Sequence, residues 1–336
     1  MRTLALLLLS LALPAAADYH DHPRADLLRQ NLKDNYGFSP EELAQVDSAL
    51  AQAQRIPKLV EAEQKAPEKT ENWSQYSRRI DDDRVRGGLQ LIAAHRETFT
   101  RAEQEFGVPA PAIAAIMGVE TRYGSLTGKT RVLDALATQG FDHPTRGDFF
   151  IGELAEFFAF CREFGFMPDA PQGSYAGAMG DAQFMPSNYR RLALDYDHDG
   201  RTDLWSIDDA IGSIAHYFVA YKPELGWTRG APLVVPAALA GRLPDDFPRN
   251  GKAPTHTVAQ IEAAGVRPWI TLPPGQPAGL VELPLDDGGK EYWIALPNFY
   301  SVMTYNPRTF YAMAVSVLAQ RIEQARDAEY AEAGSR

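Results

Sequence analysis

The sequence predicts a predominantly helical α+β protein, and three observations lead to that fold class. Apolar residues recur at helical spacing over residues 24–66, 82–106 and 309–326. Residues 227–296 instead are rich in Pro and Gly and contain two short apolar runs typical of strands. The 336 residues are 45% hydrophobic and 23% charged, an ordinary composition for a globular protein of about two domains.

The first helical segments, residues 24–66 and 82–106, are rich in Ala, Leu, Glu and Gln. Residues 109–165 predict two more helices, and 173–190 form a stretch rich in Gly and Ala. The next elements are two strands, Leu280–Leu285 and Tyr292–Leu296, joined by the turn Asp286-Asp287-Gly288-Gly289. The last helix, residues 309–326, suggests that the two ends of the chain pack together around a small inserted α+β unit.

The charge and the cysteine content exclude several classes of protein. A formal charge of -11 leaves no overall positive field, so we expect no nucleic-acid partner. The single cysteine, Cys161, has no partner for an intramolecular disulfide or for a thiol-rich metal site. Because it lies among phenylalanines, we expect it to be buried and inert.

The first seventeen residues have the pattern of a secretory signal peptide. Arg2 gives a positive start, Leu4–Leu13 is an apolar core too short to span a bilayer, and residues 15–17 are alanines. No cysteine follows this core as an attachment point for a lipid, and no later stretch reaches about 18 consecutive apolar residues. We therefore expect export to the periplasm and a soluble mature protein without a transmembrane segment or lipid anchor.

Glu120 occupies a core position on an apolar helix. Pro109 and Pro111 can open this helix and Gly124 can close it, and Glu120 falls on the same stripe as Ile113 and Met117. Burial and the negative end of the helix dipole both raise the pKa expected for such a carboxyl, as a general acid requires. The pattern alone leaves a second interpretation open, in which Glu120 pairs with Arg122 or Lys129 or reaches solvent.

An acidic loop follows, with carboxylates at positions 1, 3, 5 and 9 and glycine at position 6. These are Asp195, Asp197, Asp199, Asp203 and Gly200, the spacing by which an EF-hand loop wraps oxygen ligands around calcium. Ser206 stands at position 12 instead of the usual Glu, so Asp208 or Asp209 would have to close a longer loop. The alternative is an acidic surface turn without an ion. Because crowded carboxylates repel one another, the sequence favours a structural calcium site.

Several long motifs, taken in chain order, resemble the lytic murein transglycosylase B family. They are Gly118-Val-Glu-Thr-Arg-Tyr-Gly124, Gly128-Lys-Thr-Arg-Val-Leu-Asp-Ala-Leu-Ala-Thr138, Gly173-Ser-Tyr-Ala-Gly-Ala-Met-Gly-Asp-Ala-Gln-Phe-Met-Pro-Ser187, Asp203-Leu-Trp205, Leu296-Pro-Asn-Phe-Tyr300 and Tyr305-Asn306. The resemblance covers residues 73–315. It implies a peptidoglycan substrate, a lysozyme-like helical core, a flanking helical domain and a small β-containing domain.

The resemblance also implies domain limits. They are a helical domain at 18–106, completed by 312–336; a core at 107–226 that contains the loop 195–209 and is completed by 297–311; and an α+β domain at 227–296.

The resemblance further assigns roles to individual residues. It implies that Glu120 is the single catalytic acid and base, and that Ser174 helps to position the N-acetyl group of the sugar. The implied glycan-binding residues are Tyr76, Gln183, Tyr305, Asn306 and Tyr311. The implied calcium ligands are Asp195, Asp197, Asp199, the backbone carbonyl of Arg201, and Asp209. The family usually has Arg before the Tyr-Asn pair, where this chain has Thr304, which puts any contact of that Arg in doubt.

One carboxyl group suffices for the reaction that the resemblance implies. Protonated Glu120 donates to the oxygen between N-acetylmuramic acid and N-acetylglucosamine, and the resulting carboxylate removes the proton of the muramyl C6 hydroxyl. That hydroxyl attacks intramolecularly and closes a 1,6-anhydro ring, so water is not a reactant. Two alternatives remain. One is a hydrolytic muramidase with Asp181 or Asp148 as a second carboxylate; the other is a non-catalytic, calcium-stabilised glycan-binding protein.

Overall fold

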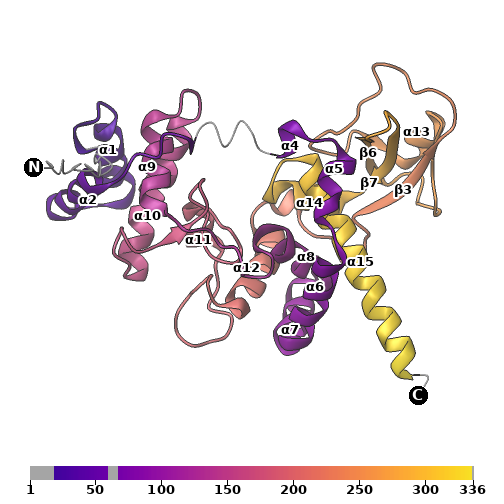
Figure 1. The fold of residues 1–336 in the computed structure, drawn as a ribbon, viewed down its shortest axis with the longest axis horizontal. Coiled ribbons are helices and arrows are strands. Elements are labelled where there is room, and N and C mark those ends of the chain that lie inside the picture. Colours follow the sequence, from indigo (N-terminus) through magenta and orange to yellow (C-terminus); the bar gives the residue numbers. More distant parts are fainter. Residues whose placement is uncertain (1–18, 60–66, 335–336) are drawn as a thin grey trace, which may run out of the picture. The chain divides into compact units, whose positions relative to one another are not determined.

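The computed structural model describes residues 19–59 and 67–334 (Figure 1), so the predicted signal peptide lies outside the described residues. The chain divides into two compact units. The first unit comprises Met1–Glu61 and Lys129–Ala178, and the second comprises Ala62–Gly128 and Met179–Arg336. None of the described helices is long and apolar enough to cross a bilayer.

The first unit is a helical cluster built around α10 (Gly147–Phe164), which packs against α9 and α1. Local sequence signals set the helix ends, because Ser39 forms a capping box with Glu42 and left-handed Gly37 and Gly165 close α1 and α10. The other elements are η1 (Tyr19–Asp21), α1 (Ala25–Tyr36), α2 (Pro40–Gln52), β1 (Thr130–Arg131), α9 (Val132–Asp142) and β2 (Gln172–Gly173).

The helices of the second unit surround α8 (Ala110–Thr121), which contacts α6, α7, α12 and α15. Ten of its residues are buried, as expected of a helix that is apolar all around. The other helices are α4 (Pro67–Thr70), α5 (Trp73–Tyr76), η2 (Ser77–Arg79), α6 (Asp82–Ala94), α7 (Arg96–Phe106), α11 (Pro186–Leu192), α12 (Ile207–Ala220), η3 (Pro223–Leu225), α13 (Val258–Ala263), α14 (Pro297–Tyr305) and α15 (Thr309–Gly334).

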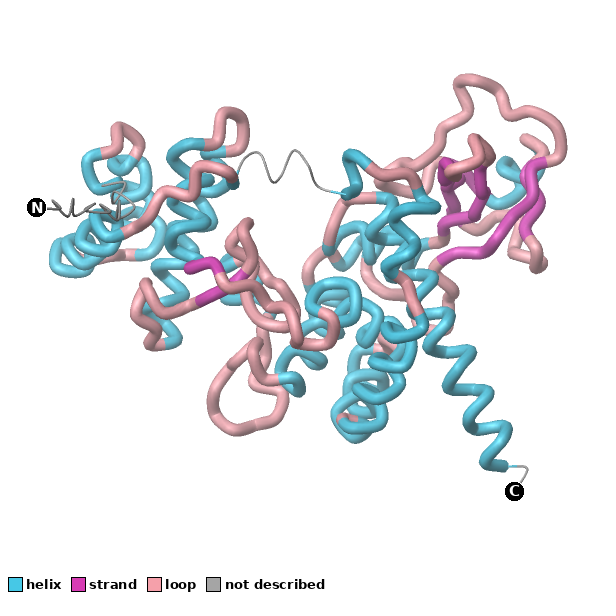
Figure 2. The backbone as a smooth tube through the Cα atoms, viewed as in Figure 1, coloured by secondary structure: helices cyan, strands magenta, loops and turns pink. Residues whose placement is uncertain are grey.

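A five-stranded antiparallel sheet also belongs to the second unit (Figure 2), with strand order β4-β6-β7-β3-β5. Helix α13 packs against it over a buried cluster that includes Ile261, Leu280 and Ile294. The strands are β3 (Val234–Leu239), β4 (His256–Thr257), β5 (Val266–Pro268), β6 (Pro277–Pro284) and β7 (Lys290–Ala295).

The predominantly helical α+β fold class is confirmed, and the two predicted strands overlap β6 and β7, each extending one residue beyond the end of the observed strand. Strands β3, β4 and β5 were not predicted, since they are short or carry prolines that obscure the alternation. Residues 109–165 form α8, α9 and α10 rather than two helices.

The compact units also differ from the predicted division, which placed residues 18–106 in one helical domain. Helix α1 packs against α10, whereas α6 packs against α8 and α15. The periodicity of a helix shows which face is apolar but not which distant segment covers it.

Candidate active site

Glu120 lies in the last turn of α8 and is half-buried. The helix ends at Thr121, earlier than the predicted closure at Gly124, because Arg122 and Tyr123 adopt left-handed backbone conformations with φ of 49° and 58°. The carboxylate thus projects from the end of an otherwise apolar helix, where the helix dipole opposes negative charge. This placement favours a carboxyl group that exchanges a proton over one that serves only as a fixed anion.

Two tyrosines that the sequence singled out lie beside this carboxylate. The Tyr311 hydroxyl donates a hydrogen bond of 2.6 Å to Glu120 Oε1, and Tyr311 is only 3% exposed. Burial, and secondly the Glu120 charge, raise the pKa values of Tyr311 and Tyr305 well above their ordinary value. Both phenols therefore stay protonated and act as neutral donors; the Tyr305 hydroxyl donates to the Ala182 carbonyl.

Tyr76 belongs to an aromatic cluster next to these residues. Its ring centroid lies 6.2 Å from that of Trp73 and 5.6 Å from that of Phe310. Phe310 directly precedes Tyr311, and Tyr76 also contributes to the raised pKa of Tyr311. Sequence reasoning missed Phe310 as a part of this cluster, although its position between Thr309 and Tyr311 was visible.

Gln183 supports the segment that follows α8. Its backbone is left-handed, with φ of 51°, and its side-chain amide donates to the carbonyls of Thr127 (3.1 Å) and Gly180 (2.8 Å). Asn306 is half-buried and caps the end of α14, and the preceding Thr304 hydroxyl donates to the Ser301 carbonyl at 2.6 Å. Gln183 and Asn306 thus belong to the same unit as Glu120.

Ser174 belongs to the first unit, unlike the other predicted site residues. Its hydroxyl oxygen accepts hydrogen bonds from the backbone N–H groups of Ala176 (3.2 Å) and Ala178 (3.1 Å). Its own N–H donates to the Ala178 carbonyl at 2.9 Å. The serine therefore organises the Gly- and Ala-rich turn that contains it.

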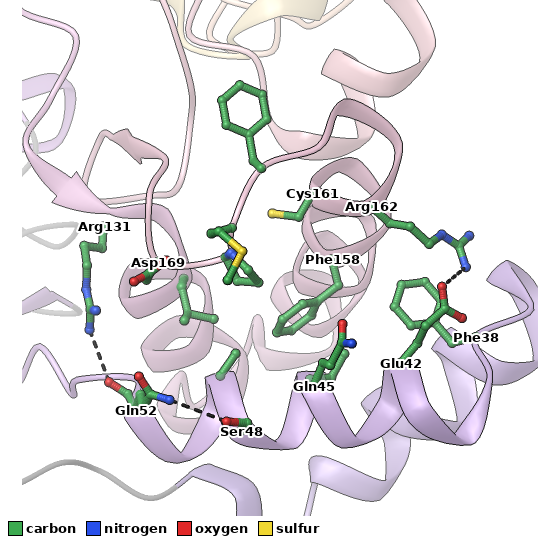
Figure 3. Close-up of a pocket in the computed structure, with 16 residues that line it drawn as sticks. Phe38, Glu42, Gln45, Ser48, Gln52, Arg131, Phe158, Cys161, Arg162 and Asp169 are labelled. Carbon is green, nitrogen blue, oxygen red and sulfur yellow. Dashed lines mark hydrogen bonds and ion pairs between the residues drawn. The ribbon is translucent and has the colours of Figure 1, made fainter.

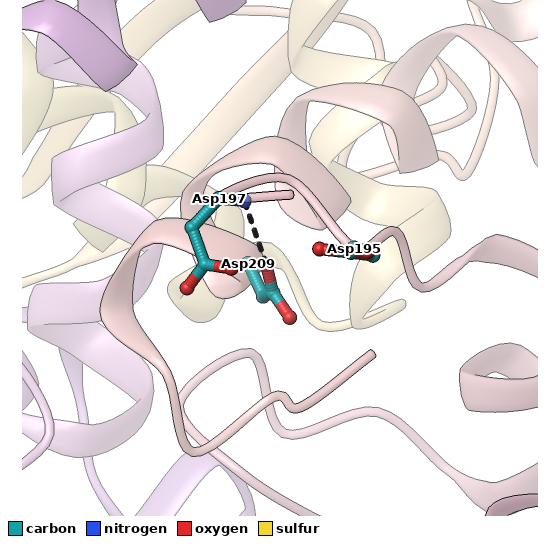
Figure 4. Close-up of side chains that lie close together, drawn as sticks. All are labelled: Asp195, Asp197 and Asp209. Atoms are coloured by element: carbon teal, nitrogen blue, oxygen red, sulfur yellow. Dashed lines mark hydrogen bonds between the residues drawn. The ribbon is translucent and has the colours of Figure 1, made fainter. Parts of the chain in front are cut away.

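The acidic loop brings together the carboxylates of Asp195, Asp197 and Asp209 (Figure 4). One oxygen from each lies within 4.8 Å of the others, and Asp209 is only 1% exposed. Burial raises the pKa of Asp209, an effect opposed by the backbone N–H groups that donate to it. Hard carboxylate oxygens converging in this way fit the ligand chemistry of Ca²⁺.

Asp209 closes the loop from the first turn of α12. Its oxygens accept hydrogen bonds from the backbone of Tyr196 (2.6 Å) and Asp203 (2.7 Å). Asp208 instead accepts the Thr98 hydroxyl at 2.6 Å. Ser206, at the position of the missing Glu, donates to Asp197 at 3.1 Å.

Two of the predicted calcium ligands remain apart from the carboxylate cluster. Asp199 is exposed and is not one of its three members. Arg201 is also exposed, and its N–H donates to Asp199 Oδ1 at 2.8 Å. The ligand roles of Asp199 and of the Arg201 carbonyl therefore stay predictions.

A family model described as a transglycosylase SLT domain matches residues 21–320. The chain belongs to this transglycosylase family. It is 38% identical over 320 residues to membrane-bound lytic murein transglycosylase B of Escherichia coli, covering 92% of this chain and 85% of that protein. The family resemblance predicted from the motifs is confirmed, and the chain is a lytic transglycosylase.

Solved structures of related lytic transglycosylases have the same fold. The catenated form of SltB1 from Pseudomonas aeruginosa is 39% identical and aligns with a TM-score of 0.83, covering 92% of this chain and 100% of that one. Slt35 of Escherichia coli in complex with calcium is 37% identical, with a TM-score of 0.79 and coverage of 92% and 95%. Slt35 has also been solved in complex with bulgecin A, with 38% identity, a TM-score of 0.81 and the same coverage.

The two candidates for a second catalytic carboxylate have very different surroundings in this transglycosylase. Asp148 is 96% exposed at its side chain and pairs with Arg24 in the first unit. Asp181 is 4% exposed, and burial, with a smaller effect from Asp203, raises its pKa to about 6. The carboxylate oxygens of Asp181 pack against Gly124 in the turn that follows α8, since a Cβ added at Gly124 would lie only 3.2 Å from them.

A separate cavity of about 340 Å³ lies within the first unit, between α2 and α10 (Figure 3). Three of its four charged groups are already engaged, since Arg162 pairs with Glu42 at 3.5 Å and Arg131 donates to the Gln52 carbonyl at 3.2 Å. Cys161 on its wall is buried, as predicted, and burial raises the pKa of the thiol, which disfavours the reactive thiolate.

Proposed function

We propose that this lytic transglycosylase cleaves the β-1,4 bond between N-acetylmuramic acid and N-acetylglucosamine in peptidoglycan, with Glu120 as its only acid and base. The observation that carries the proposal is the hydrogen bond from Tyr311 to Glu120 at the end of an apolar helix. It supports a carboxyl group that is oriented by a neutral donor.

The same carboxyl group acts twice in the proposed reaction. Protonated Glu120 first donates to the glycosidic oxygen, and the N-acetyl oxygen of the substrate stabilises the anomeric carbon as that bond breaks. The resulting carboxylate then takes the proton of the muramyl C6 hydroxyl, whose oxygen bonds to the anomeric carbon. This intramolecular attack yields a 1,6-anhydromuramyl end and regenerates protonated Glu120 without consuming water.

Other residues hold the glycan in this proposal. Tyr76, Tyr305, Tyr311 and Asn306 bind the sugar rings, and their membership of one unit with Glu120 supports these roles. Gln183 keeps the segment after α8 in place through its bond to Thr127 and presents the remainder of its amide to substrate. Ser174 positions the N-acetyl group.

The acidic loop is a structural calcium site in this proposal. Asp195, Asp197 and Asp209 supply carboxylate oxygens, joined by Asp199 and by the carbonyl of Arg201. When bound, calcium neutralises carboxylates that would otherwise repel one another. The calcium complex of Slt35 supports this assignment. The ion stabilises the loop and takes no part in proton transfer.

The proposed compartment is the periplasm, after removal of residues 1–17. The positive start, short apolar core and alanines of that segment support export. The Escherichia coli relative is named as membrane-bound. Cell fractionation, with the amount of this protein measured in the soluble periplasmic and membrane fractions, tests the soluble form proposed for this chain.

Mass spectrometry of soluble products tests the proposed reaction directly. Purified peptidoglycan is incubated with the protein lacking residues 1–17 and with its Glu120→Gln variant, which keeps the size and the acceptor oxygen. We expect anhydromuramyl products from the unmodified enzyme and a rate at least about 10³-fold lower from the variant. Reducing muramyl ends would indicate hydrolysis, and binding of glycan without products would indicate the non-catalytic alternative.

A further inference from the structure

A cavity of about 510 Å³ opens in the second unit, where the end of α12, helix α14 and strand β6 meet. None of the residues assigned to the proposed glycan site lines it. Its walls consist largely of four prolines and two aromatic residues, namely Pro223, Pro254, Pro277, Pro297, Trp227 and Tyr300. Because the proline ring fixes the backbone angle φ, these walls are rigid, and the cavity has the size of a preformed ligand site.

The motif Leu296-Pro-Asn-Phe-Tyr300 builds one side of this cavity and has no role in the proposed reaction. Its Asn298 side chain is 0% exposed. It accepts the backbone N–H of Thr228 at 2.8 Å and donates to the Thr228 carbonyl at 2.9 Å. These two bonds hold the segment that carries Trp227 against α14, so the fold itself fixes the wall that faces Tyr300.

The Tyr300 hydroxyl is a polar group without a partner at this wall. Tyr300 is only 2% exposed, and its hydroxyl forms no hydrogen bond with the described residues. Burial raises the pKa of the phenol well above its ordinary value, so it stays protonated and neutral. A Cβ added at Gly279 of β6 would overlap the hydroxyl. A glycine inside a strand thus makes room for this donor.

The indole N–H of Trp227 is a second donor without a partner. Its Nε1 atom is buried and has no acceptor among the described residues. The rest of the side chain stays partly exposed, with its ring centroid 5.5 Å from that of Phe218. A buried donor without an acceptor lowers the stability of the folded state, so an acceptor supplied by a ligand would recover free energy.

The charge of the cavity excludes an anionic ligand. Among the described residues that line it, Glu224 is the only charged one, and none is Lys or Arg. A carboxylate or a phosphate would therefore meet repulsion without compensation. Two neutral donors within apolar walls instead suit a neutral group that combines one strong acceptor with a small apolar part.

We propose that this cavity binds the acetamido group of an N-acetylated sugar, as an accessory glycan site apart from Glu120. The carbonyl oxygen of that group accepts hydrogen bonds from Tyr300 and, after a small rotation of the indole ring, from Trp227. Its methyl group packs against the prolines. The proposal rests on the proposed function, because it takes the N-acetylated glycan strand as the substrate.

An accessory site of this kind would favour capture of the polymer. Every sugar of the strand carries an acetamido group, so a strand held at the cavity has further sugars available to the catalytic site. The ring of Phe218 lies 5.9 Å from that of Tyr305, between centroids, and Phe218 also contacts Trp227. The two sites are therefore joined through one aromatic layer of the same unit, and binding at the first raises the effective concentration of substrate at the second.

Nuclear magnetic resonance of the Glu120→Gln protein tests the site through its indole N–H signals. The chain has five tryptophans, and the signal of Trp227 is the one that disappears in Trp227→Phe. The probes are N,N′-diacetylchitobiose and cellobiose, two neutral disaccharides that differ in the acetamido groups. We expect the Trp227 signal to shift in a saturable manner with the first sugar and to stay in place with the second.

Variants of the cavity separate this binding from binding near Glu120. We expect Tyr300→Phe to weaken the affinity reported by the Trp227 signal about fivefold, and Tyr311→Phe to leave it unchanged. Trp269→Phe is the matched control, because Trp269 is 74% exposed and lies outside the cavity. In co-sedimentation with insoluble peptidoglycan, Tyr300→Phe should lower binding by a similar factor and Trp269→Phe should not.

Several results would overturn the accessory site. They are a Trp227 signal that neither sugar shifts, an equal shift by both sugars, and an affinity that depends on Tyr311 but not on Tyr300. The titration of the Glu120→Gln protein needs no cavity variant beyond the one that assigns the signal, so it decides the question even if Tyr300→Phe fails to fold. Absence of anhydromuramyl products from the unmodified enzyme contradicts the proposed function instead, and the titration still decides whether the cavity binds the sugar.

Discussion

Glu120 and Asp209 are carboxylates of the same unit, but they occupy opposite ends of their helices. Glu120 lies in the last turn of α8 and accepts the hydroxyl of Tyr311, a neutral donor. Asp209 lies in the first turn of α12, accepts backbone N–H groups on both oxygens, and faces Asp195 and Asp197. The helix dipole opposes the charge of Glu120 and favours that of Asp209.

In the proposed function, this difference lets one side-chain type serve two kinds of chemistry. The raised pKa values of Tyr305 and Tyr311 keep both phenols protonated. A carboxyl group beside them can therefore gain and lose its proton without either phenol ionising in its place. Asp209, by contrast, is buried, is held by backbone N–H donors and lies close to the carboxylates of Asp195 and Asp197. A bound cation would neutralise the repulsion among these three carboxylates.

Among the variants that keep both Glu120 and Asp209 unchanged, the largest effect is expected from Tyr311→Phe, which removes the donor to Glu120 and keeps the ring. A hydrogen bond to a charged group contributes about 1.5–3 kcal/mol, which corresponds to about 10–100-fold in rate. We expect kcat/KM to fall by that factor, as measured by release of anhydromuramyl products. Tyr330→Phe is a suitable control, because Tyr330 is 58% exposed at the distal part of α15. Activity unchanged by Tyr311→Phe would contradict the idea that this hydroxyl orients Glu120.

A smaller effect, on stability, is expected from the calcium loop. At a calcium concentration of about 100 times Kd, binding stabilises the folded protein by about 2.7 kcal/mol, so chelation should lower Tm by about 5–10 °C. Asp209→Asn should abolish this response, because it removes the charge of the buried ligand. Asp208→Asn should keep it, since Asp208 contacts Thr98 outside the cluster. The measurement is calorimetry with calcium and with chelator, and an unchanged Tm of the unmodified protein would contradict an occupied site.

The sequence predicted the apolar helix that carries Glu120 and the acidic loop, but not the division of the chain into the two compact units. Glu120 on an apolar stripe and the acidic loop were visible because both depend on local spacing within one element. The bond between Glu120 and Tyr311 joins residues 191 positions apart, so no local pattern reveals it. The packing of α1 on α10, rather than with α6, depends on tertiary contacts in the same way.

Backbone conformation was the other feature that the sequence did not disclose. The left-handed turn at Arg122 and Tyr123 contradicts the ordinary preference of both residues, and the glycines that permit it lie mainly on α6.

The smallest effect on activity is expected from Asp181→Asn, which separates the single-carboxylate reaction from a hydrolytic one. Burial raises the pKa of Asp181 from 3.8 to about 6, so the folded protein binds this proton more tightly than the unfolded chain does. The resulting stabilisation is complete below pH 3.8 and is lost as the pH rises through about 6. Because the amide of Asn stays neutral, the variant does not undergo this loss of folding free energy, which is at most about 3 kcal/mol.

We therefore expect Asp181→Asn to raise Tm at pH 8 and to leave it unchanged near pH 4, with chelator present so that the charge of calcium does not contribute. Asp148→Asn, at an exposed carboxylate, should not alter this pH dependence. Anhydromuramyl products should form at a similar rate in the Asp181→Asn variant, since no second carboxylate takes part in the proposed reaction. Loss of these products in a variant that remains folded would make Asp181 part of the chemistry and favour a two-carboxylate mechanism.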